Sequence, residues 1–269
     1  MNILLLGDIM GPSGRKAIIE QLPKIIKKKK IDFTIVNGEN SGDLGVGITK
    51  KIFDDFLNAG ADVVTTGNHV WDEKEAMEFI TKEARLLRPQ NLIKGSPGNG
   101  YGIFNSKNKK KVAVINLMGN VFMKKSEDVF EEAKKFIQTV KLKKDADFIV
   151  VDMHGEITSE KMAMGYLFDG KATMVVGTHT HVPTSDHIIM EKGTAYQTDV
   201  GMCGDYKSVI GMDRDNSLKR FFKDPTAKRH YPALGEGTVS GLMVMADENT
   251  GLAKKVEPIV VGKYLENRI

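Results

Sequence analysis

The feature that most constrains the fold is a series of short, largely apolar runs that each end in polar side chains able to bind a cation. The runs are Ile3 to Leu6, Phe33 to Val36, Ala61 to Val64, Phe148 to Val151 and Ala172 to Val176. Such short apolar runs are typical of strands buried on both faces. In open α/β sheets, ligands and reactive groups collect at the carboxyl ends of such strands. We therefore expect an α/β fold with a functional site at one sheet edge.

Length and composition fit one large globular domain over residues 1–269. The chain is 41% hydrophobic and 28% charged, and a domain of this length buries about three quarters of its unfolded surface. We found no internal repeat and no linker. The net charge of +4 is too small to indicate nucleic-acid binding, but it suits a small anionic substrate.

The sequence predicts a cytoplasmic protein. Cys203 is the only cysteine, so no internal disulfide can form and a reducing compartment is the simpler context. The N-terminus lacks the basic region of a signal peptide, and no apolar run reaches the length of a membrane span. The sequence leaves a homo-oligomer and a regulatory protein partner open.

Helices and further strands complete the expected α/β pattern. Helices are predicted over Ser13 to Lys28, after an N-cap at Thr49, over Glu75 to Lys82, after an N-cap at Ser126, and over Ser217 to Lys223. Strands are also predicted at Tyr101 to Phe104, Val112 to Leu117, His187 to Met190, Thr194 to Gln197, Thr238 to Ala246 and Lys255 to Val261. The polar stretch 199–215 is predicted to be a loop near the site.

Four segments allow two interpretations each. Asp8 could be a helix N-cap or a site carboxylate. The glycine-rich loop 41–47 lacks the lysine of a P-loop, and it either brings backbone close to the site or is simply flexible. Trp71 could cover a substrate ring or pack against the core. The run Lys27 to Lys30 fits a solvated helix end better than a binding patch.

The ends of the five apolar runs supply seven candidate metal ligands and one further histidine. The ligands are Asp8, Glu39, Asn40, Asn68, His154, His179 and His181, and the further histidine is His69. Carboxylate, amide and imidazole groups without a thiolate suit manganese, iron or zinc better than calcium. Seven ligands exceed the three or four of a single catalytic zinc and suffice for two ions that share a carboxylate. Asn68 and His69 are neighbours at a strand end, so we expect their side chains to diverge, one toward metal and one toward substrate.

These blocks resemble a known family. Gly7-Asp8, Gly38-Glu39-Asn40, Gly67-Asn68-His69, His154-Gly155 and Gly177-Thr178-His179-Thr180-His181 are similar to the ordered motifs of the calcineurin-like metallophosphoesterases, and in particular of the YmdB-like bacterial members. Two departures from the wider superfamily, Met10 in place of a histidine and Glu39 in place of an aspartate, are typical of the YmdB-like subfamily.

The resemblance implies a four-layer αββα sandwich with two mixed sheets and two metal ions. We expect these ions to be iron or manganese in preference to zinc. Asp8, Glu39, Asn40 and His181 would hold one ion. Glu39, Asn68, His154 and His179 would hold the other, and His69 would serve as the catalytic proton donor.

The implied activity is a metal-dependent phosphodiesterase that hydrolyses 2',3'- or 3',5'-cyclic nucleotides by attack of a metal-bridged hydroxide. A phosphomonoesterase or a nuclease could use the same site, and a regulatory protein could retain the metals and act through partner binding. The loops 41–47 and 97–102 contain no lysine or arginine, which favours a singly charged diester over a monoester.

Overall fold

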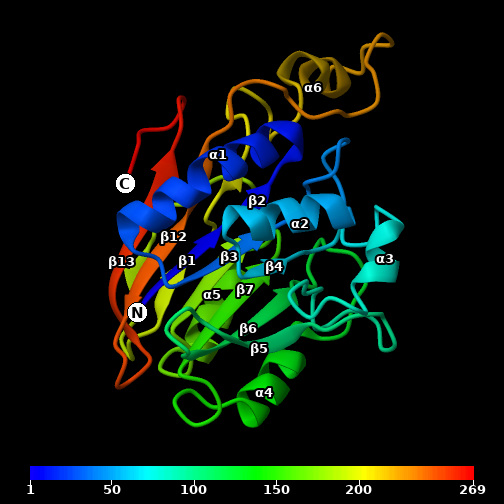
Figure 1. Ribbon diagram of the computed structural model, residues 1–269. Helices are drawn as coiled ribbons and strands as arrows, with labels where there is room; N and C mark the ends of the chain where they lie inside the picture. The colour runs from blue at the N-terminus through cyan, green and yellow to red at the C-terminus, as the bar shows by residue number, and fades with distance from the viewer.

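The computed structural model describes residues 1–269 and contains two mixed β-sheets packed face to face (Figure 1). In the first sheet the strand order is β13 (Ala253–Val261), β12 (Val239–Ala246), β1 (Asn2–Leu6), β3 (Phe33–Asn37) and β4 (Val63–Thr65). Strands β1, β3 and β4 run parallel, whereas β12 is antiparallel to both of its neighbours. The carboxyl ends of β1, β3 and β4 therefore meet at one edge.

The second sheet has a parallel centre and antiparallel margins. Its strand order is β5 (Tyr101–Asn105), β6 (Lys111–Met118), β7 (Phe148–His154), β8 (Met174–Thr178), β10 (Ala195–Gln197) and β9 (Ile188–Ile189). Strands β6, β7, β8 and β10 run parallel, and β5 and β9 are antiparallel to their neighbours. A small ribbon of β2 (Asp8–Ile9) and β11 (Met202–Cys203) joins the end of β1 to the later loops.

Alternation along the strands explains why the sheets are covered on both faces. In β1, Ile3 and Leu5 face the core between the sheets, whereas Leu4 and Leu6 face the helices. The helices of the first sheet are α1 (Gly11–Lys29), α2 (Lys50–Ala59) and α3 (Glu75–Phe79). Those of the second sheet are α4 (Val129–Thr139) and α5 (Thr158–Phe168). The four-layer αββα sandwich is confirmed.

One further helix, α6 (Arg214–Phe221), projects from the body of the sandwich in Figure 1. It belongs to a long excursion between β11 and β12. No helix combines the length and the apolar character that a membrane crossing requires.

The structure corrects three sequence-based predictions about helices. Helix α4 is capped by Asp128, whose side chain accepts from the N–H groups of Phe130 and Glu131, and not by Ser126. Helix α3 ends at Phe79 rather than at Lys82. Helix α5 is absent from the sequence-based expectation, because its buried residues include a lysine and a glycine and its polar and apolar residues do not separate into clear faces.

Two open interpretations are also decided. The N-cap of α1 is Met10, which makes no side-chain cap hydrogen bond, so Asp8 does not cap this helix. Trp71 is partly buried against the core on the helix side of the first sheet, which favours packing over contact with a substrate.

Candidate metal centre

The eight predicted site residues come together at the carboxyl ends of the central strands. Asp8 follows β1, Glu39 and Asn40 follow β3, and Asn68 and His69 follow β4 in the first sheet. His154 ends β7, and His179 and His181 follow β8 in the second sheet. The centre therefore lies between the two sheets, and each sheet contributes ligand atoms.

Four of the candidate ligands converge on one point, and we call them the His154 group: Glu39, Asn68, His154 and His179. The Nε2 atom of His154 lies 3.0 Å from Glu39 Oε1, 3.0 Å from Asn68 Oδ1 and 3.1 Å from His179 Nδ1. One proton on His154 can satisfy only one of these three acceptors, whereas a metal cation in their midst would satisfy all of them. This crowding of lone pairs fits a metal ion.

The electrostatics of the His154 group point the same way. Burial would lower the pKa of His154, but the charge and hydrogen bond of Glu39 raise it to about 9. Burial would raise the pKa of Glu39, but His154 and His69 lower it to about 2. Burial and the positive charge of His154 lower the pKa of His179 to about 3. The group therefore retains a negative carboxylate and a neutral imidazole, and it favours a positive charge at its centre.

The remaining ligands form the Asp8 group: Asp8, Asn40 and His181. Asp8 is fully buried, and its Oδ1 has no hydrogen-bond partner, although its Oδ2 accepts from the backbone N–H of His179 at 3.0 Å. His181 Nε2 lies 3.2 Å from Asn40 Oδ1. Burial raises the pKa of Asp8, against the charges of His181 and His154. An unpartnered buried carboxylate oxygen is costly, and a bound cation would remove that cost.

Hydrogen bonds outside the ligand set fix the imidazole tautomers. Thr178 Oγ1 donates to Asp152 Oδ1 at 2.7 Å, so it accepts the Nδ1 proton of His154 at 2.9 Å. His181 Nδ1 donates to the backbone oxygen of Ile210 at 2.7 Å. Nε2 is thus the nitrogen of both residues that faces the cluster, and it would offer its lone pair to a metal ion that replaces the proton there.

His69 and Asn68 diverge as expected, but for a different reason. Both residues lie in a turn beyond β4 and not in extended backbone. The Asn68 side chain faces His154, whereas His69 Nδ1 lies 2.6 Å from Asp72 Oδ2. The backbone N–H of His69 donates to Glu39 Oε2 at 3.0 Å. His69 is thus next to the centre, with its ring outside the ligand cluster.

The neighbouring glycine shows how tightly this turn is packed. A Cβ atom at Gly67 would lie 2.3 Å from both Glu39 Oε2 and His154 Nε2. Any side chain at this position would displace the two residues that the turn covers.

Comparison with known proteins identifies the family. The family of YmdB-like proteins matches residues 4–259. The chain belongs to the YmdB-like family. It is 44% identical over 261 residues to the 2',3'-cyclic-nucleotide 2'-phosphodiesterase of Bacillus subtilis (strain 168), with 97% of each chain covered.

Two solved structures share the fold over nearly the whole chain. A hypothetical protein from Thermus thermophilus superimposes with a TM-score of 0.88 and 34% identity, covering 98% of this chain and 100% of that one. A novel phosphatase from Mycoplasma pneumoniae superimposes with a TM-score of 0.89 and 34% identity, covering 97% and 93%.

Sequence reasoning missed a buried ion pair that holds the two histidines of the His179-Thr180-His181 segment. Both histidines have positive φ angles, 98° and 65°, which are unfavourable for residues with a side chain. Asp199 Oδ2 accepts from the backbone N–H and the hydroxyl of Thr180 at 3.1 and 2.7 Å. Lys161 of α5, also fully buried, donates to the same oxygen at 2.8 Å. The polarity of the 199–215 stretch indicates a loop near the site, but Lys161 gives no sequence signal.

A second missed residue, Asp152, connects the two sheets beneath the centre. Its Oδ2 accepts from Asn37 Nδ2 of β3 at 3.1 Å and from Thr65 Oγ1 of β4, and its Oδ1 accepts from Thr178 of β8. Burial raises the pKa of Asp152 to about 6. Its alternation with His154 along β7 is visible in the sequence, but its partners are not.

The glycine-rich loop 41–47 carries backbone to the Asp8 group, as one of its two interpretations predicted. Asn40 Nδ2 donates to the backbone oxygen of Gly45 at 3.0 Å, which turns Asn40 Oδ1 toward His181. The loop therefore orients a candidate ligand.

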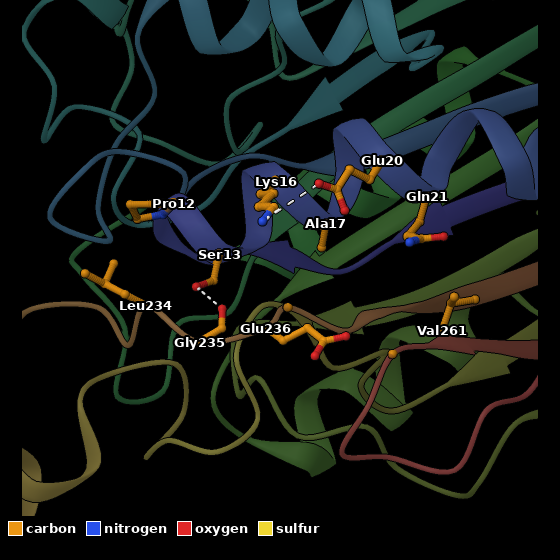
Figure 2. A pocket seen from close by; sticks show the side chains of 12 residues that line it. Pro12, Ser13, Lys16, Ala17, Glu20, Gln21, Leu234, Gly235, Glu236 and Val261 are labelled. Carbon is orange, nitrogen blue, oxygen red and sulfur yellow. Dashed lines mark hydrogen bonds and ion pairs between the residues drawn. The ribbon is translucent and has the colours of Figure 1, made fainter.

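A cavity of about 630 Å³ lies away from the centre, between the first turns of α1 and the segment 234–237 (Figure 2). Ser13 Oγ donates to the backbone oxygen of Gly235 at 2.8 Å, and Lys16 pairs with Glu20. None of the eight predicted site residues lines this cavity. It is therefore separate from the metal centre.

Proposed function

We propose that this protein is a phosphodiesterase that hydrolyses cyclic nucleotides at a centre of two metal ions, iron or manganese in preference to zinc. Relatives named phosphodiesterase and phosphatase align with nearly the whole chain, so the chain is a hydrolytic phosphoesterase. The observation that carries the proposal is the convergence of three acceptors on His154 Nε2 beside the unpartnered oxygen of Asp8.

Each ligand group would hold one ion. The His154 group holds the first, and the Asp8 group holds the second together with the Glu39 carboxylate. Glu39 lies close enough to Asp8 for its charge to raise the pKa of that residue, which supports its place between the two groups. When bound, the ions supply Lewis-acid activation of water near neutral pH and offset negative charge on the phosphoryl group.

His69 is the proposed proton donor to the leaving alkoxide oxygen. The Nδ1 atom of its ring lies 2.6 Å from Asp72 Oδ2, so Nε2 is the nitrogen left to face the substrate. The backbone N–H of His69 donates to Glu39 Oε2, which keeps this residue beside the proposed metal centre. This proton transfer is needed for a diester, whose alkoxide is a poor leaving group.

A phosphomonoesterase is the second candidate, and one observation favours it. Lys124 Nζ donates to the backbone oxygen of Asn68 at 2.6 Å and lies 3.4 Å from Asp72 Oδ1. The two loops whose lack of lysine and arginine favours a diester, 41–47 and 97–102, do not include this residue. A cation at the rim could help to bind a doubly charged monoester.

A substrate panel separates the two candidates. Metal-replete enzyme should have a higher kcat/KM for 2',3'-cyclic and 3',5'-cyclic nucleotides and for bis-p-nitrophenyl phosphate than for p-nitrophenyl phosphate at the same pH. Faster turnover of the monoester would replace the diesterase proposal with a phosphatase.

A further inference from the structure

The loop between β6 and α4, residues 119–128, lies against the metal centre. The backbone N–H of Gly119 donates to the backbone oxygen of His154 at 2.9 Å. Lys124 Nζ donates to the backbone oxygen of Asn68 at 2.6 Å. The 119–128 loop is thus bonded to two members of the His154 group, one from each sheet.

Further hydrogen bonds hold this loop in one conformation. Glu160 accepts from the backbone N–H groups of Asn120 and Val121, at 3.1 Å for Asn120. The side chain of Asn91 donates to the backbone oxygens of Met118 and Glu127, at 2.7 and 3.0 Å, and so ties the two ends of the loop together. A loop with this many fixed points can present a side chain to a ligand in a defined position.

Between these fixed points the loop exposes a large aromatic ring. Phe122 is 84% exposed, and its backbone has a φ of 60°, a left-handed conformation that is unfavourable for a bulky residue. Three residues of chain span at most about 11 Å, which limits how far Phe122 can lie from the Gly119 bond to His154. Backbone strain of this kind clusters at active sites and ligand contacts.

We propose that Phe122 is the platform on which the base of the nucleotide substrate stacks, with Lys124 holding the loop to the centre. The inference rests on the proposed cyclic-nucleotide activity and adds the residue that recognises the base. An aromatic face accepts any base, because every base has a π-face, so this contact selects nucleotides over other diesters without selecting one base. Trp71, two residues after His69 in the chain, is packed against the core and does not offer such a face.

The test compares two substrates that differ only in the base. Adenosine 2',3'-cyclic phosphate and 1-O-methylribose 2',3'-cyclic phosphate present the same cyclic diester, and phosphorus NMR follows the hydrolysis of both. The wild type should have the higher kcat/KM for the nucleotide. Phe122→Ala should raise KM for the nucleotide about tenfold, as expected when one stacking platform is removed, and leave the base-free substrate unchanged.

Two further variants make the result specific to the ring at this position. Phe122→Tyr retains an aromatic face and should keep the preference for the nucleotide. Phe222→Ala removes a phenylalanine of similar exposure, 81%, beside α6, and should behave as the wild type does. The inference is overturned if Phe122→Ala keeps the wild-type preference. If the wild type hydrolyses neither cyclic substrate, the proposed function is wrong and the inference is wrong with it. That outcome differs from failure of the inference alone, in which the wild type is active and Phe122→Ala keeps its preference for the nucleotide.

Discussion

The two ligand groups differ in how they are held before any ion binds. In the His154 group every ligand atom already lies within about 3 Å of His154 Nε2. In the Asp8 group the ligand side chains in contact with each other are Asn40 and His181, and Asp8 Oδ1 has no partner. The atoms of the first group are already gathered around one point, whereas those of the second are positioned by the surrounding loops.

This difference shows that the fold has already brought the ligand atoms of the His154 group together, but not those of the Asp8 group. The His154 group has little to reorganise when it binds an ion, so we expect it to hold its ion more tightly. The Asp8 group retains a buried, unsatisfied carboxylate, and an ion there would relieve an existing cost.

The largest expected effect comes from removing the residue that the two groups share. Wild-type protein purified without chelator should contain close to two ions per chain by elemental analysis. Glu39→Ala should lower this content and reduce diester turnover by at least about 10³-fold, because both groups lose a carboxylate. A wild-type content of one ion that Glu39→Ala leaves unchanged would refute the dinuclear centre.

The second-largest effect is expected from a variant that loses catalysis but keeps its metal ions. His69 contacts Glu39 through its backbone, but its ring belongs to neither group. His69→Ala should therefore keep both ions and lose about 10²- to 10⁴-fold in turnover, the usual range for a positioned general acid. Loss of metal in this variant would show that His69 is a ligand and that the boundary of the His154 group is drawn incorrectly.

The smallest effect should distinguish the two groups from each other. Titration of wild-type protein with a chelator should release one ion before the other. Asp8→Asn, which is nearly isosteric, should remove the ion that leaves first, and Asn68→Ala should weaken the one that leaves last. We expect affinity changes of about 10- to 100-fold, measured by competition with a metal indicator. Equal release of both ions in the wild type would mean that the observed asymmetry has no thermodynamic consequence.

Local patterns in the sequence predicted an α/β fold with the site residues at strand ends, and the resemblance to the family implied the four-layer sandwich. An apolar run of four or five residues predicts a buried strand, and a polar residue after it must lie at the strand's end, whatever the rest of the chain does. Resemblance to the family then divided the residues into two sets, and the first set, around His154, is gathered in the structure as the motifs implied.

What the sequence did not predict depends on contacts between distant segments. Lys161 lies on an unpredicted helix, and only the fold brings it to Asp199, 38 residues away. Lys124 lies 56 residues from Asn68 and gives no signal in the sequence, because its loop contains no motif. The helix cap at Asp128 instead of Ser126 shows the same limit at short range, since either side chain satisfies the local pattern.

The hydrophobic core between the two sheets sets the separation of the candidate ligands at the sheet edge. Glu39 and Asn68 are carried by one sheet and His154 and His179 by the other, so the thickness of the layer between the sheets sets the distance between the two halves of a binding site. Side chains such as Leu5, Phe33 and Phe148 fill that layer, and none of them is a candidate ligand. A substitution that changes the volume of these buried side chains, with every ligand intact, would widen or narrow the space that an ion must fit. Selectivity among ions of different radius would then depend on residues of the hydrophobic interior.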